Sequence, residues 1–391
     1  MLLAYVSASY GFAFSAMVAF LIPLRAHELG APIGVIGLIV GAGAALPALL
    51  SVPSGELSDR LGPRKTYILS TLVSGITCLV GAYTESYWIL FCAQLVTGMG
   101  RSTAWLASQT YLSNVGRDDE RARIAGRMSF ATNGGMILAP LVIATSTDLF
   151  GLRLSFVTLT VLSLAYTLIA LRLPEVRVEK TTSRRGGSVG FGLALRLIRL
   201  PGIRLVLLST FARLWNIMFW MAFYALLLVQ KGVAPTAIGT ILAVYAVIST
   251  VVTLSAGRLA AWMGNVPALV GCLTVGSFGV ILSPYLLTYP LIFLPAILLG
   301  IGQGLSLPLL ISTVGDEAPP DQRGVALGLR MAVSQGASSS APVIAGGVAA
   351  TLGMDLSFIF NGVLAWFLLG VGLWLYHATP QPKPVALDEQ T

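Results

Sequence analysis

Twelve long apolar runs follow one another along this chain, and they limit its possible folds more than any other feature. Each has about 20 residues, the length that crosses a lipid bilayer as an α-helix. Hydrophobic residues make up 56% of the chain and charged residues only 10%, against roughly 25% charged residues in soluble domains. The sequence therefore predicts an all-α membrane protein. The expected spans lie near residues 3–24, 33–52, 66–83, 87–111, 125–147, 153–172, 203–228, 235–255, 267–287, 289–312, 325–350 and 355–376.

The second half of the chain repeats the first at an offset of 202 residues. The segment from Gly55 to Gly62 aligns with the segment from Gly257 to Gly264. Nine glycines recur at this offset, whereas chance would give about two such pairs. The first members of these pairs are Gly30, Gly37, Gly55, Gly62, Gly98, Gly100, Gly126, Gly134 and Gly151.

A duplicated block of six apolar helices indicates two pseudo-symmetric six-helix bundles. Secondary transporters commonly bind solute where two such halves meet. We expect the N-terminal bundle to comprise residues 1–172 and the C-terminal bundle residues 203–378. The polar, basic segment 173–202 would link them through the cytoplasm, and residues 379–391 would form a polar tail.

The basic residues lie almost entirely on one side of the predicted spans. When the 24 lysines and arginines are placed on alternate sides, 19 fall on the side of the termini and the linker and 3 on the other. Cytoplasmic segments of membrane proteins carry such an excess. Both termini are therefore expected in the cytoplasm, in a multi-pass protein of an inner or plasma membrane. This distribution also explains the net charge of +8 without a nucleic-acid partner.

The segment between the second and third spans carries a recognisable motif, Gly55-Glu-Leu-Ser-Asp-Arg-Leu-Gly-Pro-Arg-Lys65. It resembles the Gly-x-Leu-x-Asp-Arg-x-Gly-Arg-Lys loop of the major facilitator superfamily. Twelve spans in a 6+6 repeat, with a long central cytoplasmic loop, are similar to that family as well. The resemblance implies a transporter fold that works by alternating access.

The resemblance also implies a conformational latch in this loop. Asp59 would face the start of the eleventh span, where the positive helix terminus holds it and favours the state open to the outside. The latch residues would be Gly55, Asp59, Arg60, Gly62 and Arg64. The second copy has Ala261 and Trp262 at the equivalent positions, so such a latch is one-sided. The alternative is a solvated turn whose charges only set the topology.

The fifth and eleventh spans each contain an Ala-Pro pair, Ala139-Pro140 and Ala341-Pro342. Exporters of the family have a Gly- and Pro-rich motif in the fifth span, which this sequence matches in part. Proline in a membrane helix removes a backbone hydrogen bond, and small neighbours let helices approach closely. The pairs indicate either export or helix packing alone.

Polar residues inside the spans are the candidate solute-binding residues. A charged side chain at the centre of a bilayer costs at least about 2.5 kcal/mol, so it is expected to face a cavity or a partner. Asn133 pairs with Gln335, and Arg101 with Gln303, at the offset of the repeat. The candidates are Arg101, Gln94, Asn133, Arg213, Asn216, Trp220, Gln303 and Gln335. The alternative is that they make structural contacts between helices.

No aspartate or glutamate lies in the middle of a predicted span, and both histidines lie outside the spans' centres. Buried carboxylates commonly carry proton coupling, so a proton remains only one candidate for the coupling ion. Asp148 and Glu56, near helix ends, are the nearest candidates. No cofactor and no metal site are expected, and no catalytic grouping indicates an enzyme.

The sequence thus predicts a secondary transporter of a small organic solute that functions as a monomer in the lipid bilayer. The favoured interpretation is export of amphipathic, drug-like compounds or metabolites. The alternative is an organic-anion transporter, for a carboxylate or a phosphate ester, because Arg101 and Arg213 lie in the spans without buried acids.

Overall fold

The computed structural model describes residues 2–115, 121–175, 195–319 and 322–378, except for the side chains of residues 51–60, 113, 115, 121–123 and 125. All regular elements in these ranges are helices. They are α1 (Leu2–Glu28), α2 (Ile33–Leu61), α3 (Pro63–Tyr83), α4 (Tyr87–Val115), α5 (Arg121–Leu171), α7 (Pro201–Gln230), α8 (Pro235–Thr253), α9 (Ala256–Met263), α10 (Asn265–Leu282), the 3₁₀ turn η2 (Leu291–Phe293), α11 (Leu294–Glu317), α12 (Arg323–Leu352) and α13 (Met354–Ala378).

Nine of the described helical segments are long and apolar enough to cross a membrane. One of them, Gly126–Leu171, contains two of the predicted spans, because α5 turns sharply at Gly151, where φ is 79°. The long helices α4 and α12 are less apolar, and they carry Arg101 and Gln335 of the candidate set. The helices therefore match the twelve spans expected from the sequence.

The duplication appears in the backbone as well as in the sequence. The structure describes six glycines with positive φ, and they form three pairs at the offset of 202. A positive φ is strained for residues with a Cβ atom, so each pair marks a turn that only glycine makes readily. The pairs are Gly30 with Gly232, Gly62 with Gly264, and Gly151 with Gly353.

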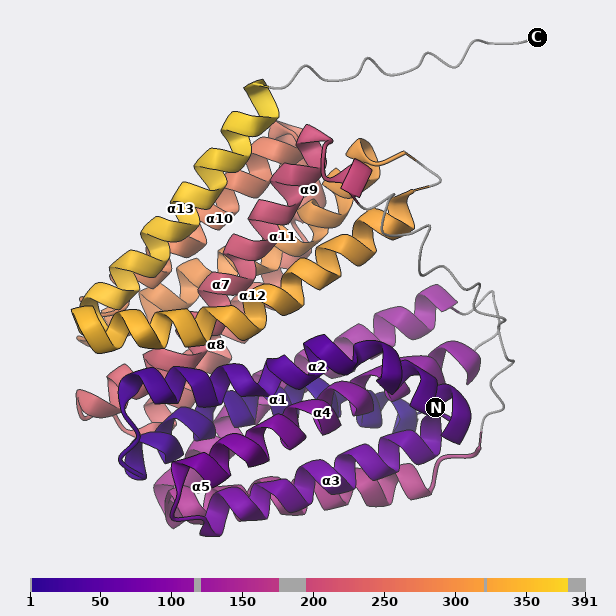
Figure 1. Cartoon of the computed structure of the whole chain (residues 1–391), viewed down its shortest axis with the longest axis vertical. Coiled ribbons are helices and arrows are strands. Elements are labelled where there is room, and N and C mark those ends of the chain that lie inside the picture. Colours follow the sequence, from indigo (N-terminus) through magenta and orange to yellow (C-terminus); the bar gives the residue numbers. More distant parts are fainter. Residues whose placement is uncertain (1, 116–120, 176–194, 320–321, 379–391) are drawn as a thin grey trace.

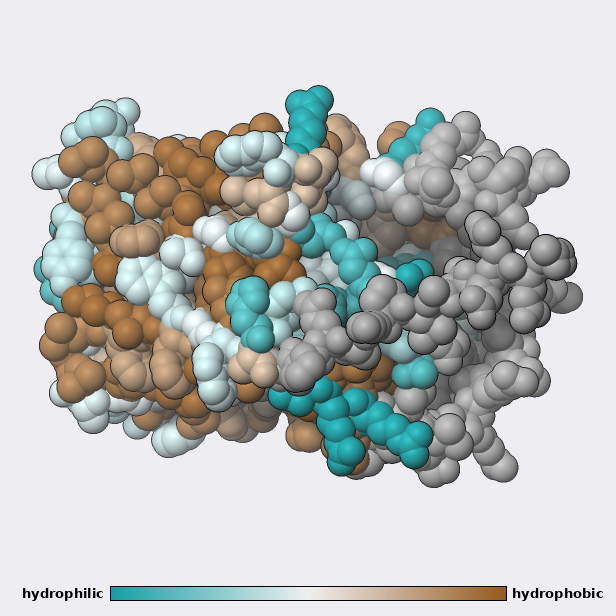
Figure 2. All heavy atoms as spheres, turned by 90° about the horizontal axis from the view of Figure 1, so that it is seen from above, coloured by the Kyte–Doolittle hydropathy of each residue, from teal (hydrophilic) through white to brown (hydrophobic). Residues whose placement is uncertain are grey.

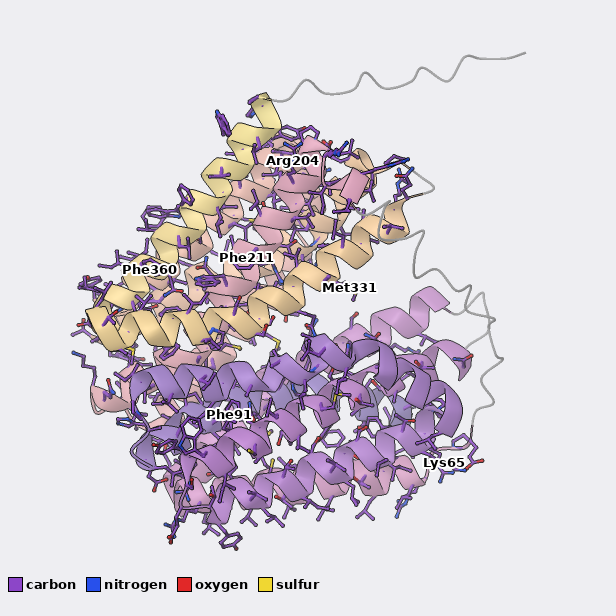
Figure 3. All side chains as sticks on the ribbon, in the orientation of Figure 1. Lys65, Phe91, Arg204, Phe211, Met331 and Phe360 are labelled. Carbon is purple, nitrogen blue, oxygen red and sulfur yellow. The ribbon has the colours of Figure 1, made fainter. Side chains whose placement is uncertain are left out.

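The helices form two bundles, one made by α1–α5 and the other by α7–α13 (Figure 1). The bundles contact each other through α2 with α12, α5 with α8, and α1 with α7. Figure 1 shows that they meet at one end and diverge toward the end where α1 begins and α13 ends. Lys65 and Arg204 lie at this diverging end in Figure 3, whereas Phe360 lies toward the other end.

Large apolar side chains cover the outside of both bundles. Leu49 is 77% exposed, Trp374 68% and Leu168 63%, which would be costly in water. In Figure 2 the described surface is mostly apolar, and hydrophilic residues gather toward one end. Since helices satisfy their own backbone hydrogen bonds, such a surface is suited to lipid.

A buried arginine ties α1 to α3 at the end where the bundles meet. Arg25 is 1% exposed. Its Nε donates to the Gly81 carbonyl at 3.1 Å, and its Nη2 donates to the carbonyls of Ala82 and Thr84 at 3.2 and 2.8 Å. Its Nη1 donates to Glu28 at 2.7 Å. The guanidinium thus satisfies carbonyls at the C-terminus of α3 that have no partner within the helix.

We expect Arg25→Leu to destabilise the N-terminal bundle by about 3 kcal/mol, because it leaves these buried carbonyls and Glu28 without their donor. Thermal unfolding of the purified protein in detergent measures this loss. Arg153→Leu is the matched control, since Arg153 is exposed after the bend in α5. Equal melting temperatures for the two variants would contradict the prediction.

Candidate functional site

The two halves touch through pairs of glycine and proline on neighbouring helices. Gly37 of α2 packs against the carbonyl of Pro342 in α12 so closely that a Cβ atom has no room. Gly239 of α8 packs in the same way on α5, where a Cβ atom would lie 2.7 Å from the carbonyl oxygen of Pro140. Gly37 and Gly239 are equivalent in the repeat, as are Pro140 and Pro342. One contact is therefore made twice, and the Ala-Pro pairs take part in packing between the halves.

At the same end of the interface, the contact between α5 and α8 includes a polar bond that the equivalent contact between α12 and α2 lacks. The backbone amide of Thr236, in the first turn of α8, donates to Asp148 Oδ2 of α5 at 2.7 Å. A carboxylate here satisfies a free amide and interacts favourably with the helix dipole. At the equivalent place Gly34 lies near Ala350, and a Cβ atom on Gly34 would be 3.7 Å from the Ala350 Cβ. Asp148 thus lies at an exposed helix terminus.

Arg101 extends from α4 toward α1 and α2 in the N-terminal half. Its Nη1 donates to Ser15 Oγ at 2.8 Å, and its Nη2 makes a long contact of 3.4 Å with the Gly43 carbonyl. The side chain is half-buried. Both acceptors are neutral, so the charge of the guanidinium is not compensated by them.

Arg213 takes the corresponding place in the C-terminal half, but it extends from the first span of its half, whereas Arg101 extends from the fourth. It lies on α7, the equivalent of α1, and reaches α11, the equivalent of α4. Its Nε donates to Ser306 Oγ at 2.9 Å, and its Nη2 lies 3.4 Å from the Gln303 carbonyl. Gln303 in turn donates from Nε2 to the Arg213 carbonyl at 2.9 Å. Each half therefore holds one half-buried arginine between its first and fourth spans, bonded to neutral oxygens.

Asn133 and Gln335 lie on the helix faces that touch the opposite half. Residues seven positions apart share a face of an α-helix. Asn133 precedes Pro140 by seven residues, and Gln335 precedes Pro342 by seven. Both side chains are half-buried. They thus lie two turns from the glycine–proline contacts, toward the end where the bundles diverge.

The other candidates are buried inside their bundles. Asn216 is 2% exposed and donates to Ser277 Oγ of α10 at 2.8 Å. Trp220 is fully buried, and its indole donates to Ser283 Oγ at 3.0 Å. These contacts place both residues on the side of α7 that faces α10.

Gln94 is also buried, at 6% exposure, and its Nε2 packs on Gly43, where a Cβ atom would lie 2.6 Å away. Its Oε1 has no hydrogen-bond partner among the described residues, and Gln94 is one of the residues that line a cavity of about 10 Å³, the room that one water molecule needs. Gln303 is 3% exposed. The structure therefore brings only Arg101, Arg213, Asn133 and Gln335 to partly accessible positions.

Carboxylates are absent from the neighbourhood of these residues in the described part of the chain. The ion pairs that the structure gives join Arg25 to Glu28, and Arg64 and Lys65 to Glu175, all at helix ends or loops. No group of three or more metal-binding side chains occurs among the described residues. The partly accessible residues therefore carry positive charge and amide groups, a combination suited to binding an anion.

The sequence matches the Major Facilitator Superfamily over residues 1–342 and again over residues 205–391. The protein belongs to this superfamily. It is a membrane transporter of small solutes and not an enzyme. The fold agrees with this assignment, because the nucleoside transporter NupG superposes with a TM-score of 0.79 over 96% of this chain and 98% of that one, at 16% identity.

A bacterial homolog of the human lysosomal transporter Spinster, in an inward-facing and unoccupied conformation, superposes with a TM-score of 0.76 at 16% identity, covering 96% of this chain and 95% of that one. At such identities the likeness concerns the fold alone.

Curated relatives of this superfamily member transport different solutes. It is 23% identical to the staphylopine export protein of Staphylococcus aureus, over 95% of this chain and 94% of that protein. It is 27% identical to the gentisate transporter of Corynebacterium glutamicum, over 86% of this chain and 77% of that protein. A probable sulfoacetate transporter of Cupriavidus necator is 30% identical over 151 residues, which are 38% of this chain and only 34% of that protein.

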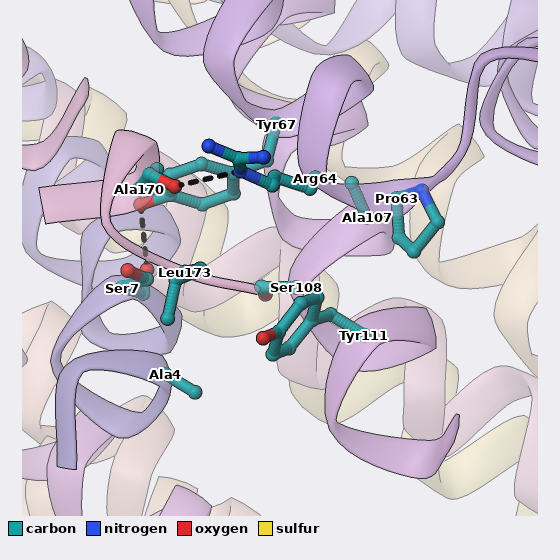
Figure 4. Close-up of a pocket in the computed structure, with 10 residues that line it drawn as sticks. All are labelled: Ala4, Ser7, Pro63, Arg64, Tyr67, Ala107, Ser108, Tyr111, Ala170 and Leu173. Carbon is teal, nitrogen blue, oxygen red and sulfur yellow. Dashed lines mark hydrogen bonds between the residues drawn. The ribbon is translucent and has the colours of Figure 1, made fainter. Parts of the chain in front are cut away.

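The expected latch of this superfamily member lies partly outside the described side chains, which exclude Gly55, Asp59 and Arg60. Gly62 makes the turn between α2 and α3 with a φ of 85°. Arg64 contacts the C-terminal end of α5, where its Nε donates to the Ala170 carbonyl at 3.3 Å (Figure 4).

The pocket beside Arg64 is too small for an organic solute. Figure 4 shows it between Arg64, Tyr67 and Tyr111, and its volume of about 10 Å³ suits one water molecule. A larger cavity, of about 370 Å³, lies between α1 and the two limbs of α5 and is lined mostly by apolar residues, among them Phe14 and Leu138. It belongs to the N-terminal bundle and is separate from the arginines.

Proposed function

We propose that this transporter moves a small organic anion, bearing a carboxylate, sulfonate or phosphate ester, by alternating access between its two halves. The observation that carries the proposal is the pair Arg101 and Arg213. Each is half-buried, and among the described residues each donates to neutral oxygens of its own half and to no carboxylate. Burying two guanidinium groups without an acid is costly, and an anionic solute offsets that cost.

The geometry of arginine suits such a solute. A guanidinium has five donors in a planar fork that matches two oxygens of an acidic group. The bonds to Ser15 and Ser306 use one nitrogen each, and the contacts of 3.4 Å with backbone carbonyls are long for hydrogen bonds. Donors therefore remain for a ligand between the halves. Asn133 and Gln335 add neutral donors and acceptors from the opposing fifth and eleventh spans.

We propose further that the diverging end of the bundles faces the cytoplasm. This orientation follows from the basic residues at that end, such as Lys65 and Arg204. The Gly37–Pro342 and Gly239–Pro140 contacts are then the closed outer gate, and the arginines are reached from inside. Transport requires these contacts to separate while the other end closes.

Anion specificity of a relative supports this choice over a neutral solute. The gentisate transporter is related over most of both chains, and its named solute is an acid. Export of amphipathic compounds is the second candidate. The relationship to the staphylopine export protein, over nearly the full length of both chains, supports export as the direction. The apolar cavity of about 370 Å³ supports an amphipathic solute.

Purified protein in liposomes tests the proposal. We expect saturable, protein-dependent uptake of small carboxylates or sulfonates, and competition among them, in a panel that includes neutral and cationic compounds of equal size. Thermal stabilisation by the same anions in detergent is the matching binding measurement. Uptake of neutral or cationic compounds alone would replace the anion proposal with the second candidate.

A further inference from the structure

Besides Arg101 and Arg213, a third arginine is partly enclosed, and it lies inside the C-terminal half. From the sequence alone this arginine was expected only to help set the membrane topology. Arg330 belongs to the third turn of α12, which begins at Arg323. Its side chain is half-buried, and its Nε is buried without a hydrogen-bond partner. A guanidinium nitrogen in this state is rare, because leaving a buried charged donor unpaired costs several kcal/mol.

The helix face of Arg330 is the one that packs into its own bundle. Ala326 and Ala337, one turn before it and two turns after it, are 1% and 0% exposed. Ala326 belongs to the apolar core that contains Val206 of α7 and Leu309 of α11. The opposite face of α12, with Pro342, packs on α2. Arg330 is therefore directed toward α7 and α11, the two helices that Arg213 joins.

Arg330 and Arg213 act on each other as like charges. Arg213 bridges α7 and α11 through its bond to Ser306, and Arg330 is directed toward the same two helices, so the two guanidinium groups lie in one region and repel each other. No described carboxylate lies between them: Asp316 accepts from Asn265 at the end of α11, and Glu317 accepts from Tyr376. Two repelling guanidinium groups with spare donors form a site for negative charge.

This arrangement has no copy in the N-terminal half. The residues equivalent to Arg213 and Arg330 are Gly11 and Met128. The half that holds Arg101 thus presents one positive charge, and the other half presents two. An anion with a single charge could compensate only one of the two charges in the C-terminal half.

We propose that Arg213 and Arg330 form a two-arginine subsite, so that the preferred solute carries two acidic groups, as a dicarboxylate or a carboxylate with a sulfonate or phosphate. This inference rests on the proposed transport of organic anions and specifies the solute's charge. Arg330 is a specificity-determining residue in it, whereas Arg101 and Arg213 serve anions in general.

Matched pairs of acids test the subsite in proteoliposomes with the full chain. Benzoate with phthalate, and butyrate with succinate, differ by one carboxylate each. We expect the wild-type protein to prefer the diacid by about tenfold or more in transport efficiency. Arg330→Gln should remove this preference while monoacid transport persists. Arg323→Gln is the matched control, because Arg323 is exposed at the start of α12 and donates to the Gly315 carbonyl.

Arg330→Met provides a second variant that fits the fold, since methionine occupies the equivalent position in the other half. Thermal shifts with phthalate and benzoate supply a readout that does not depend on transport. A diacid preference that persists in both variants would overturn the subsite and leave the anion proposal intact. Failure of the wild-type protein to bind or move either acid of each pair would overturn the anion proposal itself.

Discussion

Arg213→Gln and Arg101→Gln should each lower anion transport by about 30-fold or more, because removing one partner of a buried charge interaction costs 2–5 kcal/mol. Either change removes one of the two arginines, Arg101 and Arg213, that are proposed to serve anions in general. Glutamine keeps a donor to Ser306 or Ser15, so the helix contacts seen at 2.9 and 2.8 Å can survive the loss of charge. Initial uptake rates of a radiolabelled substrate acid in proteoliposomes measure the effect.

Lysine variants separate charge from geometry at the same positions. Lysine keeps the charge but loses the planar fork, so Arg213→Lys should recover only part of the activity. Arg258→Gln is the control for net charge, since Arg258 is exposed on α9. Loss of transport in Arg258→Gln equal to that in Arg213→Gln would show that overall charge, and not a solute site, is being measured.

A second large effect is expected where the halves meet. Gly37→Leu and Gly239→Leu should force the two halves apart at the contacts with Pro342 and Pro140, because neither position has room even for a Cβ atom. The conformation that is closed at these contacts would become inaccessible, and the conformational equilibrium would move toward the state in which this end is open. Transport should fall to background while the protein remains folded, since neither glycine lies inside a bundle core.

Accessibility of an engineered cysteine measures this shift. In a background without Cys78, Cys92 and Cys272, Asn133→Cys should react with a membrane-impermeant maleimide from the basic side only. Adding Gly239→Leu should make it reactive from the opposite side. Gly347→Leu is the matched control, because nothing lies within 4 Å of a Cβ atom at that glycine of α12. Unchanged sidedness in Gly239→Leu would contradict this account of the gate.

Apolar length and duplication were sufficient to predict the architecture from the sequence. Apolar length predicted the spans, and three of the glycine pairs found at the offset of 202, namely those of Gly30, Gly62 and Gly151, are turns with positive φ in the structure. The same offset brought Asn133 and Gln335 to equivalent faces at the interface. A repeated fold places equivalent residues at equivalent backbone positions, so the repeat was the strongest guide to this pair of candidate residues.

The sequence could not predict which neighbouring helix a side chain faces within its bundle. Asn216 and Trp220 were grouped with Arg213 because they follow it along α7, yet they face α10 and are buried. A helix that is apolar on all sides gives no signal of which face borders a neighbour. Arg330 is one of the 19 basic residues that the sequence places on the cytoplasmic side, and only the packing shows that its Nε is enclosed.

The paired glycine–proline contacts have a consequence for how such a chain arose. If one six-helix unit is placed twice around a twofold axis, Gly37 of each copy meets Pro140 of the other, which is what Gly37–Pro342 and Gly239–Pro140 represent after fusion. A self-complementary surface of this kind is what a symmetric homodimer needs. One six-helix unit therefore carries both sides of this contact, so two separate copies have the surfaces needed to close this end without a covalent link between them.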